Sequence, residues 1–178
     1  MPAVPERSIP EWSMPPPMVG GHVTGPVVVA RSERAILIVR QVLAYGNGLG
    51  IEVEAYGRGT YRQEQGRTPD LDHGLRFSLL IADGRVARMD DESGLRDGRG
   101  PMMTNAGGQS GGGYDGSEDV RLSLWVWPLP PPGPVVLTCS WERAGLAEAK
   151  LTLDPDAIRT AAAASEPYWR TDRPDESL

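Results

Sequence analysis

The chain has 178 residues, and its 24 acidic and 18 basic residues give a formal net charge of −6. That length suits one domain with its own hydrophobic core. All but one of the basic residues are arginines, and they are scattered along the chain rather than gathered in a run. We therefore expect neither a nucleic acid nor a membrane surface as a partner.

Cysteine use and the first residues indicate where the protein works. Cys139 is the only cysteine, so no disulfide can form within the chain. The N-terminus lacks the apolar core of a signal peptide, and the longest apolar stretch, residues 35–39, is much shorter than the roughly 20 residues of a membrane-spanning helix. We expect a cytoplasmic protein.

Residues 1–26 contain seven prolines. Proline removes backbone donors, so neither a helix nor a central strand is expected there. We predict a proline-rich extended N-terminal arm in which Trp12 is an apolar anchor. The arm docks either on its own domain or on a partner subunit.

The domain itself is expected to span residues 27–169. Residues 35–44 are apolar at both odd and even positions, which predicts a central strand covered on both faces. Residues 49–56 follow a hairpin-turn sequence and alternate cleanly, which predicts a half-solvated strand. Further strands are predicted at residues 27–30, 75–81, 85–89, 119–127, 135–141 and 148–153, with long loops at residues 57–74 and 90–117.

The last element is predicted to be a helix. Asp154 is a favourable N-cap, and Pro155 suits the first helical position, so a helix is expected over about residues 155–165. Residues 170–178 are predicted to be a frayed tail. About eight strands joined by short turns, with one C-terminal helix, predict a mainly β fold, an antiparallel β-sandwich. A closed β-barrel is the alternative, because a list of strands does not fix closure.

No motif names a reaction. Residues 108–112 match the glycine–x–serine–x–glycine pattern of hydrolases, but that pattern works only between a strand and a helix, and no helix follows here. The same glycines lack the lysine and the helix of a phosphate-binding loop. A hairpin loop is the prediction for this stretch.

Acidic residues recur in the predicted loops, and carboxylates from several loops can bind calcium. No spacing matches a known calcium loop, so we predict no cofactor. His73, beside an aspartate, is the better placed of the two histidines for acid–base chemistry. The weak metal-ligand candidates are Asp70, Asp72, Asp90 and Asp91.

In the strand predicted at residues 119–127, two tryptophans occupy the positions that alternate with the apolar residues. If that face packs in the core, Trp125 and Trp127 point outward. Together with Trp12 they would then form a binding surface for a ligand or a protein. The alternative is that the arm, or the pair Tyr168 and Trp169, covers them.

Residues 125–134 read WVWPLPPPGP, and a strand ending in Trp141 and an Asp-capped, alanine-rich helix follow. In these features the chain resembles a set of uncharacterised hypothetical proteins from high-GC actinobacteria, over roughly residues 25–170. The resemblance implies an actinobacterial, cytoplasmic origin. It implies no activity and no site residues.

The outward tryptophans, the arm and the lack of a convergent acid–base set favour a non-catalytic binding or protein-interaction module. Its partner would be another protein or further copies of the chain. Two alternatives stay open. One is a metal-dependent or His/Asp-based hydrolase that uses the loop carboxylates, and the other is a carrier of a small apolar ligand.

Overall fold

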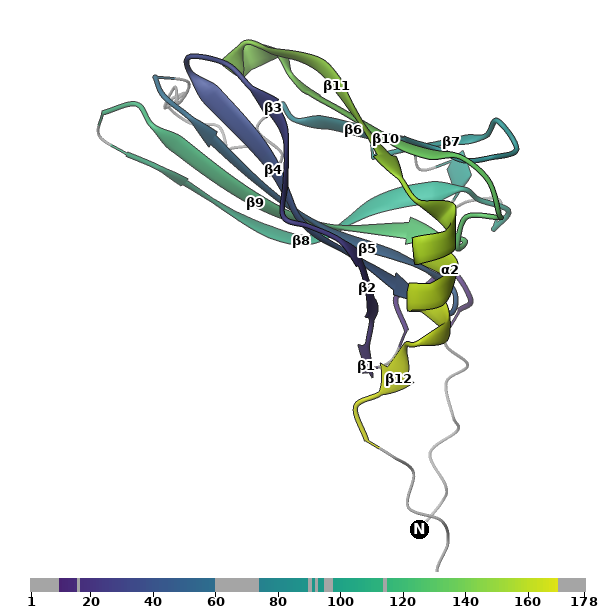
Figure 1. The fold of residues 1–178 in the computed structure, drawn as a ribbon. Coiled ribbons are helices and arrows are strands. Elements are labelled where there is room, and N and C mark those ends of the chain that lie inside the picture. The colour runs from purple at the N-terminus through teal and green to yellow at the C-terminus, as the bar shows by residue number, and fades with distance from the viewer. Residues whose placement is uncertain are drawn as a thin grey trace, which may run out of the picture.

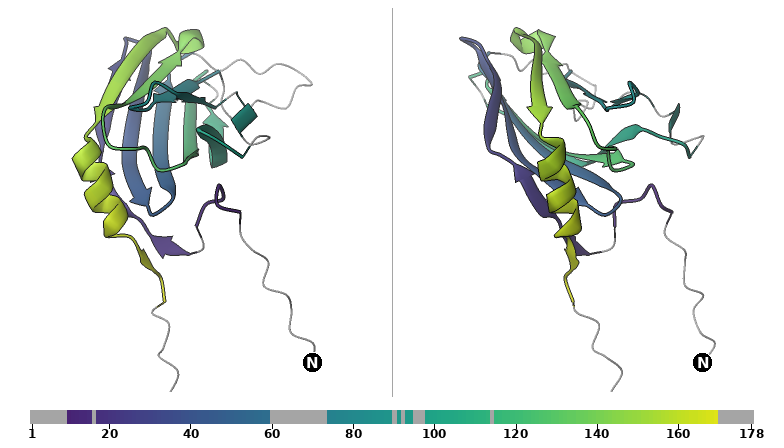
Figure 2. Two further views of the ribbon diagram at one scale, coloured as in Figure 1. Left: turned by 90° about the vertical axis from the view of Figure 1, so that its right-hand side faces the viewer. Right: turned by 45° about the vertical axis from the view of Figure 1, so that its right-hand side comes forward.

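The computed structural model describes residues 10–15, 17–59, 74–89, 91, 93–94, 98–113 and 115–169. Two antiparallel sheets are stacked face to face, and one helix lies across one end of the stack (Figures 1 and 2). The predicted β-sandwich with a C-terminal helix is thus confirmed. Both sheets stay open, so the closed alternative is wrong.

The larger sheet has six strands in the order β2-β4-β5-β9-β8, and β3 also pairs with β4. Its strands are β2 (Gly21–Thr24), β3 (Val27–Arg31), β4 (Ala35–Tyr45), β5 (Gly48–Gly57), β8 (Met102–Gly112) and β9 (Glu118–Trp127). Every pairing in this sheet is antiparallel. The sheet therefore brings together segments far apart in the sequence, such as β5 and β9.

The smaller sheet has four strands in the order β11-β10-β6-β7. They are β6 (Arg76–Leu80), β7 (Val86–Arg88), β10 (Val135–Trp141) and β11 (Leu146–Leu153), and the short helix η1 (Glu142–Ala144) joins β10 to β11. A separate two-stranded sheet pairs β1 (Met18–Val19) with β12 (Glu166–Pro167). The helix α2 (Pro155–Ala163) packs against β2 and β4.

The core lies between the two sheets and follows the predicted alternation. On β5, Leu49, Ile51 and Ala55 are fully buried, whereas Tyr56 is exposed on the opposite face. The predicted phase of β6 is confirmed as well, because its core-facing Leu79 is fully buried. The N-terminus of α2 is capped as predicted, since the side chain of Asp154 accepts a hydrogen bond from a backbone amide in the first turn.

One expectation for β4 is wrong. The strand is central, and Leu37 and Val39 on its core face are fully buried. Its other face, which carries Ile36 and Ile38, is only half-buried. The sandwich has two layers, and among the described residues no third layer lies over this face of the sheet. The strand is therefore covered fully on one face only.

The predicted arm contains two short strands. Its proline-free residues 21–24 form β2, at the edge of the larger sheet beside β4. The contact with α2 is close, because a Cβ atom at Gly21 would overlap the carbonyl oxygen of Ala161. The arm therefore docks on its own domain.

The expectation of a loop throughout residues 90–117 is also wrong. Residues 102–112 form β8, which pairs with β9 along its whole length. Glycine-rich sequence has low strand propensity, so the strand follows from this pairing rather than from its own residues. The hydrolase-like pattern at 108–112 accordingly lies in an extended strand without the sharp turn that the motif needs.

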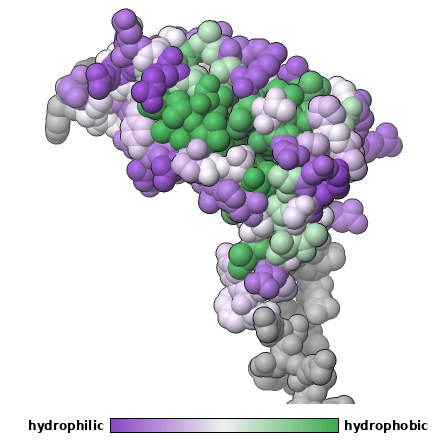
Figure 3. Space-filling model, in the orientation of Figure 1, coloured by the Kyte–Doolittle hydropathy of each residue, from purple (hydrophilic) through white to green (hydrophobic). Residues whose placement is uncertain are grey.

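The edges of the two sheets meet along one side of the sandwich. Hydrophobic side chains gather where β3 and β11 pass each other (Figure 3). Val29, Ala30 and Leu151 are partly buried there against the core. Among the described residues, no helix combines the length and apolarity that crossing a bilayer requires.

Candidate functional site

The outer face of the larger sheet carries the polar residues that alternate with the core residues. The strand register sets them in cross-strand rows. Glu54 on β5 lies opposite Arg121 on β9, and Tyr56 on β5 lies opposite Asp119. This face is therefore built by the strand register, and its residues are distant in sequence.

Glu54 is the centre of an ionic cluster on this face. Only 8% of its surface is exposed, and its carboxylate accepts a hydrogen bond from the hydroxyl of Tyr56. The Nε atom of Arg121 donates to the same carboxylate at 3.0 Å, and the Nε atom of Arg40 lies 3.5 Å from it. A buried carboxylate is stable here because each of its oxygens faces a donor or a cation.

These contacts shift the ionisation of the cluster. The hydrogen bond from Tyr56 lowers the pKa of Glu54, burial opposes this, and the positive charges of Arg121 and Arg40 lower it further. Tyr56 and Glu54 in turn raise the pKa of Arg121. Glu54 and Arg121 are therefore both charged near neutral pH, and they form an ion pair.

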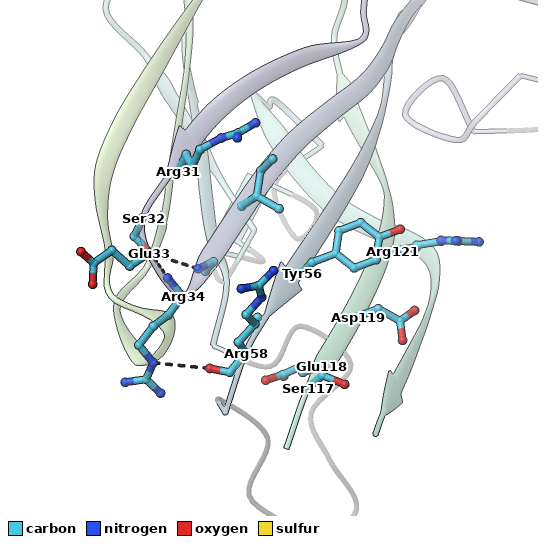
Figure 4. A pocket seen from close by; sticks show the side chains of 13 residues that line it. Arg31, Ser32, Glu33, Arg34, Tyr56, Arg58, Ser117, Glu118, Asp119 and Arg121 are labelled. Carbon is cyan, nitrogen blue, oxygen red and sulfur yellow. Dashed lines mark hydrogen bonds between the residues drawn. The ribbon is translucent and has the colours of Figure 1, made fainter. Parts of the chain in front are cut away.

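A depression of about 730 Å³ lies next to this cluster, at the end of the sheet where β3 and β4 are joined (Figure 4). Its lining comes from the β3–β4 connection, the end of β5 and the start of β9. Four arginines stand around it: Arg31, Arg34, Arg58 and Arg121. A smaller depression of about 410 Å³, which Arg121 also lines, continues over the Glu54 cluster.

Local hydrogen bonds fix the shape of this end of the sheet. The hydroxyl of Ser32 accepts from the backbone amides of Arg34 and Ala35, which closes the tight turn between β3 and β4. The Arg34 guanidinium donates to the carbonyl oxygens of Arg58 and Gly59, at 3.4 and 2.9 Å. The turn is thereby tied to the end of β5, and the Arg34 side chain and the Arg58 backbone are held in place.

The charges around the depression are unequally compensated. Glu118 is buried and pairs with Arg143 on η1, and Glu54 is paired with Arg121. In the part of the chain that the structure describes, neither Arg31 nor Arg58 has an ion pair. Both side chains are exposed at the depression. Two guanidinium groups without an ion pair in the described ranges therefore face solvent at a depression that the carboxylates of Glu33 and Asp119 also line.

The predicted metal ligands are not brought together by the described structure. Asp70, Asp72, Asp90 and the neighbouring His73 lie outside the described residues. Asp91 is exposed, and hydrogen bonds from the Ser93 side chain and from the Ser93 backbone amide, the latter at 2.9 Å, lower the pKa of Asp91. Within the described ranges, no three His, Cys, Asp or Glu side chains are grouped so that they could hold a metal ion.

The arm covers one of the three tryptophans of the predicted surface. Trp125 lies on the outer face as expected, but it is only 2% exposed. Its Nε1 atom donates to the backbone carbonyl of Trp12 at 2.9 Å, and Tyr45 packs edge-on against it with ring centroids 5.8 Å apart. Asn47 holds the arm by donating to the carbonyl oxygens of Glu11 and Ser13, each at 3.0 Å. Trp125 is therefore not accessible to a partner.

The other aromatic residues considered for this surface are more exposed than Trp125. Trp127 is half-buried, and Trp12 is 38% exposed. Tyr168 and Trp169 do not cover the tryptophans of β9, because they are 58% and 75% exposed. The arm, which is one of the two alternatives considered for covering Trp125, is the segment that covers it.

Sequence reasoning did not find the arginine-lined depression. Its one local signal is the spacing of Arg31 and Arg34 around a serine, which marks a tight turn rich in arginine. Arg58 is added only by the pairing of β4 with β5, and Arg121 only by the pairing of β5 with β9.

Comparison with models of known protein families finds no match to this chain, and no curated protein matches it.

Proposed function

We propose that the protein is a non-catalytic binding module, and that the arginine-lined depression binds a ligand bearing a carboxylate or phosphate group. The observation that carries the proposal is a pair of guanidinium groups, Arg31 and Arg58, that have no ion pair among the described residues and stand at a depression of about 730 Å³. Guanidinium groups bind both kinds of oxyanion through charge-assisted, often bidentate hydrogen bonds.

The lining supports binding rather than catalysis. Among the described residues, neither histidine nor cysteine lines the depression; of its carboxylates, Glu33 is exposed, Asp119 is half-buried, and Glu118 is paired with Arg143. The volume falls within the range of small-molecule sites. Because the lining is mostly polar and charged, it suits an anionic ligand better than the apolar ligand of a carrier protein.

The test is a titration of the full chain with inorganic phosphate and, separately, with citrate, by calorimetry at low ionic strength. We expect the double variant Arg31→Gln/Arg58→Gln to bind the preferred anion at least ten-fold more weakly, since about 1.4 kcal/mol of lost interaction corresponds to ten-fold. Added sodium chloride should weaken binding to the unmodified protein by screening.

The matched control is Arg88→Gln, which removes an exposed arginine from β7 in the other sheet. It should leave the affinity unchanged. The proposal fails if neither anion binds, or if the Arg31/Arg58 double variant binds as tightly as the Arg88→Gln control. The two titrations also separate phosphate recognition from carboxylate recognition.

A further inference from the structure

The edges of the two sheets differ in how they are protected against pairing with another strand. Natural proteins block exposed edges with charged residues, proline, bulges or very short strands. The β11 edge carries Glu148 and Lys150, β7 is three residues long and ends in Arg88, and the β2–β3 edge is interrupted at Pro26. Each of these three edges therefore has a device that discourages pairing.

The β8 edge has much less protection. Residues 102–112 contain no Asp, Glu, Lys, Arg or Pro. A bulge lies between Asn105 and Gly107, but residues 107–112 continue in regular register with β9. Among the described residues, no strand pairs with the other side of β8. Every second residue of this stretch therefore presents its backbone N–H and C=O groups at an open edge.

We propose that the β8 edge pairs antiparallel with the β8 strand of a second copy of this chain, around a two-fold axis near Gln109. The pairing would join the larger sheets of two copies into one continuous sheet. In this register Gly107 lies opposite Gly111 of the other copy, and the two Gln109 side chains lie opposite each other on the outer face.

Two features favour a second copy over a foreign peptide. Strand-adding domains select a peptide through pockets for its alternate side chains, and the glycines and serine of residues 107–112 form no such pockets. A two-fold axis also satisfies both open edges at once. Because β8 is uncharged, its self-pairing places no like charges opposite each other along the two strands, although each chain carries −6 overall.

The first test measures the mass of the full chain by sedimentation over a wide concentration range. We expect a reversible dimer, and Gln109→Lys should weaken it at least ten-fold, because the two lysines would be directly opposed across the axis. Thr152→Lys, an exposed position on the β11 edge, is the matched control and should dimerise normally. The proposal is overturned if the chain is monomeric throughout, or if the Gln109→Lys variant dimerises like the control.

The second test locates the contact. Opposed residues in antiparallel strands have Cα atoms about 4.5–5.5 Å apart, which is within disulfide range. Gln109→Cys should therefore form a disulfide-linked dimer under mild oxidation, whereas Thr152→Cys should not. The natural Cys139 does not compete because it is buried. Equal cross-linking of the two variants would overturn the proposed contact, even if the chain is a dimer.

Discussion

Glu54 shows how the outer face of a sheet can hold a nearly buried charge. Its carboxylate lies under the side chains of Arg40 and Arg121, which are themselves more than half exposed. The arginine stems exclude water from the carboxylate while their guanidinium groups remain hydrated. The cluster is therefore expected to stabilise the sheet without a covering layer.

Replacing Glu54 with Gln should lower the free energy of unfolding by about 1–2 kcal/mol at neutral pH, because the hydrogen bonds to the carboxylate lose their ionic character. Denaturant titration measures the loss. Glu148→Gln, which removes an exposed carboxylate 3.5 Å from Lys150, should cost less than about 0.5 kcal/mol. Equal losses in the two variants would contradict the role of the cluster.

The Glu54→Gln substitution should also alter the acid dependence of stability. The pKa of Glu54 in the folded protein is below its ordinary value of 4.5. Its stabilising contribution is therefore complete above pH 4.5 and is lost as the pH falls through the lower folded value. Between about pH 5 and the acid transition, the natural protein should lose stability more steeply than the Glu54→Gln variant does, and denaturant titrations repeated across this range measure the difference.

At this scale, sequence alone identified the alternation that buries Leu49 and Ile51, because period-two spacing fixes which side chains face the core. It did not find the partners of Glu54. An arginine on β9 reaches that carboxylate only after two strands about 67 positions apart have paired, and no local pattern records that pairing.

The backbones of α2 and β2 approach each other closely. Gly21 lies against the backbone of Ala161, so a side chain there has no space. Gly21→Ala should therefore displace the helix and lower the free energy of unfolding by about 2–3 kcal/mol, as overpacked sites do. Thermal unfolding and the retention of helical circular dichroism measure the effect.

Gly46→Ala is the matched control for this substitution. Gly46 lies in the turn between β4 and β5, and a Cβ atom there meets no other atom within 4 Å. Its substitution should leave stability unchanged or raise it slightly, through the restricted unfolded chain. A similar loss at Gly21 and Gly46 would mean that the helix does not need the close approach.

Strands with a strong side-chain pattern were predicted well, whereas strands that depend on pairing with a neighbouring strand were missed. Strands β9 and β10 have unbroken alternation, and their predicted bounds agree with the structure to within one residue. Strand β8 is mostly glycine and small polar residues, and strand β2 stands among prolines. Both are held by pairing with a long neighbour, which overrides their weak local propensity.

The two layers of the molecule are linked by an ion pair at the end opposite α2. Glu118 at the start of β9 is paired with Arg143, which lies on η1 between two strands of the smaller sheet. The Glu118 side chain is fully buried, whereas 43% of the Arg143 side chain is exposed. The pair therefore links the two sheets through the Glu118 carboxylate, which is shielded from solvent.

Arg143→Gln should lower the free energy of unfolding by about 3 kcal/mol, because it removes a cation that is paired with the buried Glu118 carboxylate. Urea unfolding measures the loss. Arg159→Gln breaks an exposed pair with Asp156 on α2, and should cost about 0.5 kcal/mol or less. If both variants lose the same small amount, the pair does not hold the layers together.

The pairing of β1 with β12 brings residues 18–19 and 166–167 side by side, at the pole of the molecule away from the β3–β4 turn (Figure 1). A fluorophore attached at a residue of either strand would thus lie at the same pole. Immobilisation through either of these two strands would present the arginine-lined depression to solution in the same orientation, so that tethered measurements of anion capture can be compared.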